Sequence, residues 1–349
     1  MEKKLGIVRD DVFLGHEAPG YHPECPDRLI AVGEALDSEG LSGGARIFPA
    51  RPATTEELGR VHDPRYVKSA LAALQRGSGF FDGDTYFCEG TEAAALGAAG
   101  GCIDAAIAMH RGEVDVVMAV PRPPGHHATR TRAGGFCVFN NVAVAAGALL
   151  AEGVERLLIV DWDVHHGNGT QDIFYRDPRV LFVSLHLWPH YPGSGASDEI
   201  GEGPGRGFTA NVPLPHGAGN ADALVAMERL VEPLAASFRP QRVLASTGFD
   251  GHRDDPLGGM RLDEDGFHAL GAKLQDIAAR TADGRVMMVL EGGYNLRALA
   301  TSVVAAVRGA IRGDAPRAAD AGAAAPRATA AVDRTIDALR PFWSGSFTG

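Results

Sequence analysis

The chain has 349 residues and a formal net charge of −11, and 45% of its residues are hydrophobic and 22% charged. These totals are those of a soluble globular protein with one large core or two smaller ones. The acidic balance argues against broad nucleic-acid binding and permits cationic substrates. The four cysteines form no CxxC pair, which indicates reduced thiols rather than a disulfide framework.

The N-terminus and the apolar runs predict a cytoplasmic protein. The opening stretch MEKKLGIVRDD turns charged again after a few apolar residues, unlike a signal peptide. No apolar run approaches the ~20 residues that a membrane-spanning helix needs. We therefore expect neither secretion nor contact with a membrane.

Short apolar runs alternate with Ala-rich segments along the chain. The runs are near-continuous, as in parallel strands covered on both faces, and lie at 5–8, 114–120, 156–161, 179–185, 242–247 and 285–293. Segments with helical spacing lie at 91–111, 140–152, 221–238 and 264–281. The alternation predicts an α/β fold with helices on both faces of the sheet.

The C-terminal part of the chain differs from the rest in composition. Residues 313–328 are rich in Ala and Pro, and AVDRTIDALRPFW follows them with the spacing of a short helix. We predict a single domain over residues 1–312. The segment 313–349 then either packs on this domain through its short helix or trails it.

Polar, Gly- and Pro-rich turns follow five of the predicted strands. They read PRPPGHHA, DWDVHHGNG, LHLWPHYPG, GFDGHRDDPLGG and GGYNL. In open α/β sheets, ligands bind beyond the carboxyl ends of the strands. We therefore expect these turns to converge on one functional site.

A metal site is predicted from alternating carboxylates and imidazoles. Asp161, Asp163 and His165 share one face if the chain stays extended, and Asp250 directly follows another strand. Two carboxylates and one imidazole with an open position suit catalytic Zn²⁺, with Fe²⁺ or Mn²⁺ as competitors. An isolated DxDxH is more often a solvated loop, so the prediction depends on Asp250. Asp161 is expected to support the ligands, by orienting a histidine or by offering its carbonyl to an ion.

Three further side chains are candidates for acid–base and electrostatic roles. His126 and His127 follow a rigid Pro-Pro-Gly turn, and neighbouring imidazoles suit a base and a charged partner. Tyr294 lies on a glycine-hinged turn and can donate to a developing oxyanion. The alternatives are a surface histidine pair and a packed tyrosine.

Together these motifs resemble the histone deacetylase superfamily, which includes acetylpolyamine amidohydrolases. The resemblance covers about residues 5–310 and rests on HPECPDRL, VHDPRYV, RPPGHHA, GGFCVFNN, DWDVHHGNGTQ, VSLH, GFDGHRDDPLGG and EGGYNL, in this order. Asn168 and the run NNVAVAA are similar to the class II branch, in bacterial-type form, rather than to class I.

The resemblance implies a three-layer arginase–deacetylase fold with a central, mostly parallel eight-stranded sheet. It also implies zinc on Asp163, His165 and Asp250. The paired catalytic histidines would be His126, backed by Asp161, and His127, backed by Asn168 where class I members carry an aspartate. Tyr294 would be the oxyanion tyrosine.

The family pattern also implies a narrow acyl-lysine tunnel and a structural K⁺ or Na⁺ site. Phe136 and Tyr191 would form the tunnel walls, with Gly135 beside them, although Phe136 by itself would be assigned to the core. The monovalent cation would take the carbonyls of Asp161, Asp163, His165 and Leu185 and the Ser184 hydroxyl.

The reaction implied is amide hydrolysis by metal-activated water, with the histidine pair transferring protons. Leu257 is apolar where polyamine-specific relatives carry an acid, which favours acetyl-lysine in proteins or peptides over small acetylated amines. Asp82 or Asp84 could hold a substrate backbone or a cation at the rim, or simply be a charged turn. An inactive acyl-binding protein is a remote alternative, because no catalytic residue is missing. His166 has no assigned role beyond a structural one, and the oligomeric state is left open.

Overall fold

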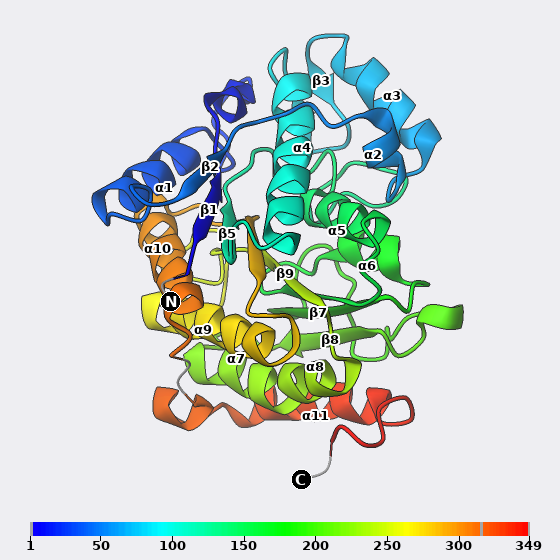
Figure 1. The fold of residues 1–349 in the computed structure, drawn as a ribbon, viewed down its shortest axis with the longest axis vertical. Helices are drawn as coiled ribbons and strands as arrows, with labels where there is room; N and C mark the ends of the chain where they lie inside the picture. Colours follow the sequence, from blue (N-terminus) through cyan, green and yellow to red (C-terminus); the bar gives the residue numbers. More distant parts are fainter. Residues whose placement is uncertain (1–2, 315–316, 348–349) are drawn as a thin grey trace.

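The computed structural model of the chain describes residues 3–314 and 317–347 (Figure 1). Residues 1–2, 315–316 and 348–349 lie outside the described residues, and with them parts of the predicted segment 313–349 and of the opening stretch. Within the described chain, eight strands form one sheet in which every neighbouring pair is parallel. The predicted α/β fold around an eight-stranded sheet is confirmed.

The strand order across the sheet places β1 and β6 in separate halves. In this order the strands are β2 (Arg46–Phe48), β1 (Leu5–Val8), β5 (Val116–Ala119), β10 (Val286–Leu290), β9 (Arg242–Thr247), β6 (Leu157–Asp161), β7 (Val180–Leu187) and β8 (Thr209–Leu214). All six predicted strands are present, and the two that the apolar pattern missed, β2 and β8, are the edges. β2 has only three residues, and β8 contains Pro213, which edge strands tolerate. A separate hairpin pairs β3 (Gly79–Phe80) with β4 (Tyr86–Phe87).

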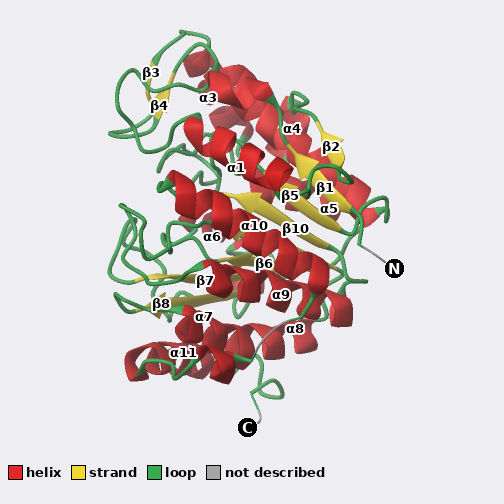
Figure 2. Ribbon diagram, turned by 90° about the vertical axis from the view of Figure 1, so that its left-hand side faces the viewer, coloured by secondary structure: helices red, strands yellow, loops and turns green. Residues whose placement is uncertain are grey.

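Helices cover both faces of the sheet (Figure 2). They are α1 (Asp27–Ser38), α2 (Thr55–Gly59), α3 (Pro64–Leu74), α4 (Thr91–His110), α5 (Asn141–Ala151), α6 (Asn168–Phe174), α7 (Asn220–Ala226), α8 (Glu232–Phe238), α9 (Glu264–Thr281), α10 (Leu296–Arg312) and α11 (Pro326–Leu339). Helices α4 and α5 pack together on one face, and α1, α9 and α10 on the other. The predicted helix 221–238 is divided into α7 and α8 by a π-helical turn.

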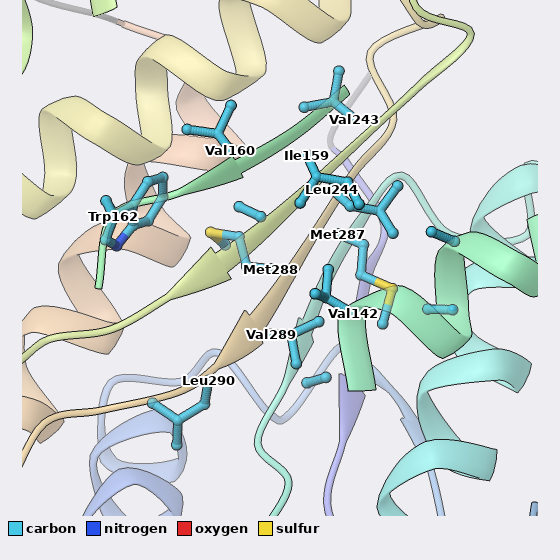
Figure 3. Close-up of a cluster of buried hydrophobic side chains, with 14 of the residues drawn as sticks. Val142, Ile159, Val160, Trp162, Val243, Leu244, Met287, Met288, Val289 and Leu290 are labelled. Atoms are coloured by element: carbon cyan, nitrogen blue, oxygen red, sulfur yellow. The ribbon is translucent and has the colours of Figure 1, made fainter. Parts of the chain in front are cut away.

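Residues of the central strands are buried on both faces. Ile159 and Val160 are neighbours in β6, point to opposite faces and are both fully buried (Figure 3). The same holds for Met287 and Met288 in β10. Since both faces are filled with apolar side chains, polar side chains of the central strands can gather only where these strands end.

Helix α4 is long and apolar enough to cross a membrane, by length and composition alone, which the sequence analysis did not expect. Of its most apolar stretch, 72% is buried inside the protein. It packs against α5 and the strands β1, β5 and β10. This burial is that of a core helix.

Helix α11 packs on the body of the protein. It contacts β8 and α7, and its buried residues include Val332, Ile336 and Leu339. The Trp343 Nε1–H beyond it donates to the Gly207 carbonyl at 2.7 Å. In the structure the helix of this segment therefore lies against β8 and α7.

We expect Leu339→Ala to lower the free energy of unfolding by about 2–5 kcal/mol, because the substitution opens a cavity under α11. Urea denaturation followed by circular dichroism measures this change. Asp337→Ala is the matched control, since that side chain is 72% exposed on the same helix, and it should cost less than about 0.5 kcal/mol. Equally small effects for both variants would show that α11 is not docked in solution.

Candidate metal centre and active site

The polar turns lie along one edge of the sheet, the edge formed by the carboxyl ends of its strands, because the strands are parallel. Asp161, the last residue of β6, is in register with Ser184 of β7 and Ser246 of β9. Strands β5 and β10 run in the same direction and end at the same edge. In Figure 2 the long loops lie at this edge, on the left. The turns quoted from the sequence are thereby brought together.

The three side chains predicted as metal ligands converge at this edge. His165 Nδ1 lies 2.9 Å from Asp163 Oδ1 and 3.1 Å from Asp250 Oδ2. One ligand atom from each residue lies within 4.8 Å of the others. Ligand atoms that share one Zn²⁺ at about 2.0–2.2 Å lie roughly 3–4 Å apart. The spacing therefore suits a single ion.

The charge and hydrogen bonding of this group also fit a cation. Apart from its contact with His165 Nδ1, the buried Asp250 Oδ2 makes no hydrogen bond within the described residues. Burial and the neighbouring Asp163 carboxylate raise the pKa of Asp250 to about 7. A buried carboxylate oxygen without a donor is costly, and a divalent cation would satisfy it. The residues present thus fit a bound metal.

Two glycines let the backbone lie directly against these carboxylates. A Cβ on Gly292 would lie 2.0 Å from Asp250 Oδ2, and one on Gly248 would lie 2.0 Å from Asp163 Oδ2. The Gly292 N–H donates to Asp163 Oδ2 at 2.8 Å. The glycines after β9 and β10 are therefore required by the position of the two aspartates.

The tandem histidines lie beside this centre with different partners. His126 Nδ1 lies 3.0 Å from Asp161 Oδ2. The centroids of the His126 and His127 rings are 4.0 Å apart. Burial disfavours a charge on His126, but Asp161 and Asp163 outweigh it and raise its pKa to about 10. Burial and the neighbouring positive His126 ring lower the pKa of His127. The pair therefore holds one charged and one neutral imidazole.

Asn168 determines which nitrogen of His127 is free. His127 Nδ1 lies 2.7 Å from Asn168 Oδ1, which can only accept, so Nδ1 carries the proton. The other nitrogen, Nε2, is then unprotonated. Gly135 lies on the same ring, since a Cβ there would be 2.4 Å from His127 Cδ2.

The turn that carries Tyr294 is fixed by hydrogen bonds of its backbone. The Tyr294 N–H donates to Asp255 Oδ2 at 2.6 Å. The Arg28 guanidinium lies 5.1 Å from its ring centroid and donates to the Gly293 carbonyl at 2.7 Å. Burial and the Asp250 charge raise the pKa of Tyr294 well above its usual value, so the phenol stays a hydrogen-bond donor.

The two predicted wall aromatics each contact the site. Phe136 has a positive φ of 69° and packs against His22 and Tyr294, at ring distances of 4.6 and 6.2 Å. Tyr191 is 45% exposed and lies 5.1 Å from the His127 ring. Both aromatics therefore lie where a substrate chain could pass between the surface and the centre.

The candidate rim residues have different surroundings. Asp82 is used within the fold: it accepts from the Thr85 N–H at 2.7 Å, and Thr85 Oγ1 accepts from the Phe136 N–H at 3.1 Å. Burial and the charge of Asp82 raise the pKa of Asp84. Leu257 is half-buried, and its carbonyl lies 3.2 Å from His190 Nε2.

The candidate monovalent-cation residues lie together where the end of β6 pairs with the middle of β7. Ser184 is paired in register with Asp161, and Leu185 follows it, buried. His186 Nε2 donates to the Gly195 carbonyl at 3.0 Å, so its Nδ1 accepts the Ser184 hydroxyl proton at 2.9 Å. The Ser184 oxygen therefore keeps lone pairs that a cation could use.

The sequence analysis missed a set of buried residues that support the site. The Glu291 carboxylate accepts from the N–H groups of Gly125 and His126, at 2.7 and 3.1 Å, and from Ser246 Oγ at 3.0 Å. His62 Nδ1 lies 2.9 Å from the Thr129 carbonyl. Arg28, His62 and Glu291 all lie in motifs quoted for the resemblance, and Glu291 also lies near the end of the predicted strand 285–293. Only their unusual place beside glycine, proline or an apolar run could have drawn attention to them.

Comparison with known proteins gives consistent matches. The histone deacetylase domain family matches residues 22–310. A protein of Archaeoglobus fulgidus named "Probable deacetylase" is 41% identical over 293 residues, 83% of this chain and 81% of the relative. The "Histone deacetylase-like amidohydrolase" of Pseudomonas aeruginosa is 42% identical over 280 residues, 80% of this chain and 74% of the relative. "Histone deacetylase 5" of Arabidopsis thaliana is 39% identical over 326 residues, 88% of this chain but 49% of the relative.

A solved structure agrees over nearly the whole fold. The crystal structure of the HDA15 HD domain matches with a TM-score of 0.90 at 36% identity. The match covers 98% of this chain and 96% of that one. The C-terminal segment beyond the family match is therefore included in the structural similarity.

We expect Gly292→Ala to lower the affinity for a divalent cation roughly tenfold or more, because its Cβ would displace the Asp250 carboxylate. Competition with a chromophoric chelator, together with elemental analysis of the dialysed protein, measures affinity and stoichiometry. Gly20→Ala is the control, since a Cβ there meets no atom within 4 Å. Equal affinities for both variants would contradict the assignment of the metal to this centre.

Proposed function

Since the chain belongs to the histone deacetylase family, we propose that it removes acetyl groups from lysine side chains of proteins or peptides. The matched relatives are named as deacetylases and an amidohydrolase, and the chain is a hydrolase of that general kind. The observation that carries the proposal is the convergence of Asp163, His165 and Asp250 with the histidine pair, close enough to Tyr294 for the charges of Asp250 and Asp163 to act on its phenol.

We propose Zn²⁺ as the resident metal, with Fe²⁺ as the alternative, held by Asp163, His165 and Asp250. The chemistry supplied by such an ion, when bound, is polarisation of the amide carbonyl and a lower pKa for the attacking water. A K⁺ or Na⁺ ion is proposed beside the end of β6 and residues 184–185 of β7, where it would stabilise the ligand loop. The support for it is the Ser184 hydroxyl, which donates to His186 and keeps its oxygen lone pairs, in register with Asp161.

Proton transfer is assigned to the histidine pair. His127 is neutral, and its free Nε2 can take a proton from the attacking water and return it to the leaving amine. His126, charged and paired with Asp161, stabilises negative charge as it develops. Two adjacent rings with opposite pKa shifts suit this division of roles.

The substrate chain is proposed to pass between Phe136 and Tyr191. Aromatic faces can hold an aliphatic stem without requiring hydrogen bonds from it. The apolar Leu257 supports acetyl-lysine as the substrate. The specific observation in favour of small acetylated amines is the pair Asp82 and Asp84, whose charges act on Tyr191 and would attract a polycation.

An inactive acyl-binding protein remains the remote alternative. All three proposed metal ligands, both histidines and the tyrosine are present and lie together. Turnover of any acetylated amine with stoichiometric release of acetate would exclude a purely binding role.

We expect Tyr294→Phe to lower kcat for an acetyl-lysine peptide about 10²–10³-fold, as for the loss of other oxyanion donors. Release of acetate in a coupled assay gives the rate, and elemental analysis checks that the metal content is unchanged. Tyr175→Phe, at the end of α6, is the control for the loss of a hydroxyl. Undiminished turnover of the Tyr294→Phe protein would remove the oxyanion role.

The substrate class is tested by direct competition. We expect kcat/KM for an acetyl-lysine peptide to exceed that for acetylputrescine and acetylspermidine, because the rim carries Leu257 rather than an acid. The same enzyme preparation should be assayed with all three compounds. A preference for the polyamines of about a hundredfold or more would reverse the assignment.

A further inference from the structure

His166 is a buried histidine that the proposed chemistry does not use. It follows the metal ligand His165 in the chain, and only 1% of its surface is exposed. Its Nε2 lies 3.0 Å from Gln171 Oε1, and its Nδ1 lies 2.8 Å from Ser194 Oγ. Both ring nitrogens are therefore occupied by groups outside the metal centre.

A carboxylate fixes the direction of these hydrogen bonds. Gln171 Nε2 donates to Glu199 Oε2 at 2.6 Å, because a carboxylate can only accept. The Gln171 oxygen must then face His166, whose Nε2 carries the proton. His166 Nδ1 is left as an acceptor for the Ser194 hydroxyl. We call Ser194, His166, Gln171 and Glu199 the relay, since each residue determines the orientation of the next.

The relay holds one end of the connection that follows β7. The other oxygen of Glu199 accepts from the N–H groups of Gly195 and Ala196, at 2.9 and 3.0 Å. Gly195 lies directly on two imidazoles: a Cβ there would be 2.6 Å from His186 Nε2 and 2.7 Å from the His166 ring. Its φ of +95° also favours glycine. Residues 194–199 are thus fixed on the two rings.

The same connection carries a proposed wall of the substrate tunnel. We call residues 188–199 the Tyr191 loop. At its other end His190 stacks on His165, with ring centroids 4.9 Å apart and planes at 17°. Between these anchors Tyr191 is 45% exposed and stands 5.1 Å from His127. No hydrogen bond of the Tyr191 side chain is described, so its position depends on its ring contacts with His127 and His165 and on the anchors at the two ends of the loop.

The relay is also connected to the C-terminal helix. Asn211 in β8 donates from Nδ2 to Gln171 Oε1 at 2.8 Å and to the Glu199 carbonyl at 3.1 Å. The Asn211 carbonyl accepts from Thr335 Oγ1 of α11 at 2.5 Å. The docked helix α11 thus supports the same polar group from the opposite side of β8.

We propose that the relay is a positioning element that sets the Tyr191 wall and thereby governs how the acyl-amine chain is bound. The relay acts on the position of the loop, not on the proton transfers assigned to His126 and His127. This inference rests on the proposed function for its kinetic readout. Its structural part, the order of the Tyr191 loop, does not depend on the reaction.

Glu199→Gln is the most informative variant. Three donors face this side chain, namely the Gly195 and Ala196 N–H groups and the Gln171 amide. An amide offers one oxygen and one NH₂ group, so in either orientation donors would oppose each other. Ser194→Ala breaks the relay at its other end. Ser197→Ala is the matched control, because the Ser197 hydroxyl lies in the same loop and has no hydrogen-bond partner among the described residues.

Two measurements test the proposal on the full-length, metal-loaded protein. Hydrogen–deuterium exchange over residues 188–200 should be faster in Glu199→Gln and Ser194→Ala than in wild type and in Ser197→Ala. With an acetyl-lysine peptide, we expect KM to rise roughly three- to tenfold while kcat changes less than about twofold. The double variant should show less than the sum of the two single effects, since both break the same relay.

The outcomes separate this proposal from the proposed function. Unchanged exchange in both relay variants overturns the positioning role, whether or not the protein turns over an acetylated amine. Faster exchange with unchanged KM overturns the link to substrate binding. A fall of kcat together with loss of metal would show that the relay supports His165 instead of the wall. If wild type hydrolyses no acetylated amine, the proposed function fails, and the exchange data still decide the order of the loop.

Discussion

The burial of three carboxylates at the carboxyl ends of the central strands is the constraint on which the rest of the site depends. Asp161, Asp163 and Asp250 are all fully buried. A buried charge is tolerated only with donors or positive charge around it. Asp161 has His126 at 3.0 Å, and Asp163 has the N–H group of Gly292, whereas Asp250 Oδ2 faces only the imidazole of His165, itself a candidate metal ligand, at 3.1 Å. This arrangement of buried carboxylates and one imidazole is one that could hold a cation.

The same electrostatics divide the histidine pair. Each ring is buried, and burial alone would make both neutral. His126 faces a carboxylate, which outweighs burial and holds the charge. His127 faces the uncharged Asn168 amide and the charged neighbour, so it stays neutral. One carboxylate and one amide, placed behind adjacent rings 4.0 Å apart, thus accompany pKa shifts of opposite direction in the two histidines.

The loops around the centre are held by polar contacts that reach across the fold. Glu291 at the end of β10 binds the backbone of the His126 turn, and Arg28 of α1 binds the turn before Tyr294. Arg28 is itself paired with Glu24, and both are fully buried. Glu24 lies only four residues before Arg28, but its carboxylate also pairs with the buried Arg122, so these ionic contacts link the segment before α1 to the turn after β5. The site is therefore carried by loops that the surrounding charges keep in one arrangement.

The sequence by itself determined the fold class and most of the centre, because these depend on local patterns. Near-continuous apolar runs such as 157–160 mark buried parallel strands. The polar residues of DWDVHHG, directly after such a run, indicate a functional site at the end of that strand. The edge strand β8 lacked such a pattern, since an edge tolerates polar residues and proline. Only the tertiary structure assigned Glu291 and His166. A single ionisable residue carries no local sign of its partners, which meet it only when parallel strands bring their carboxyl ends to one edge.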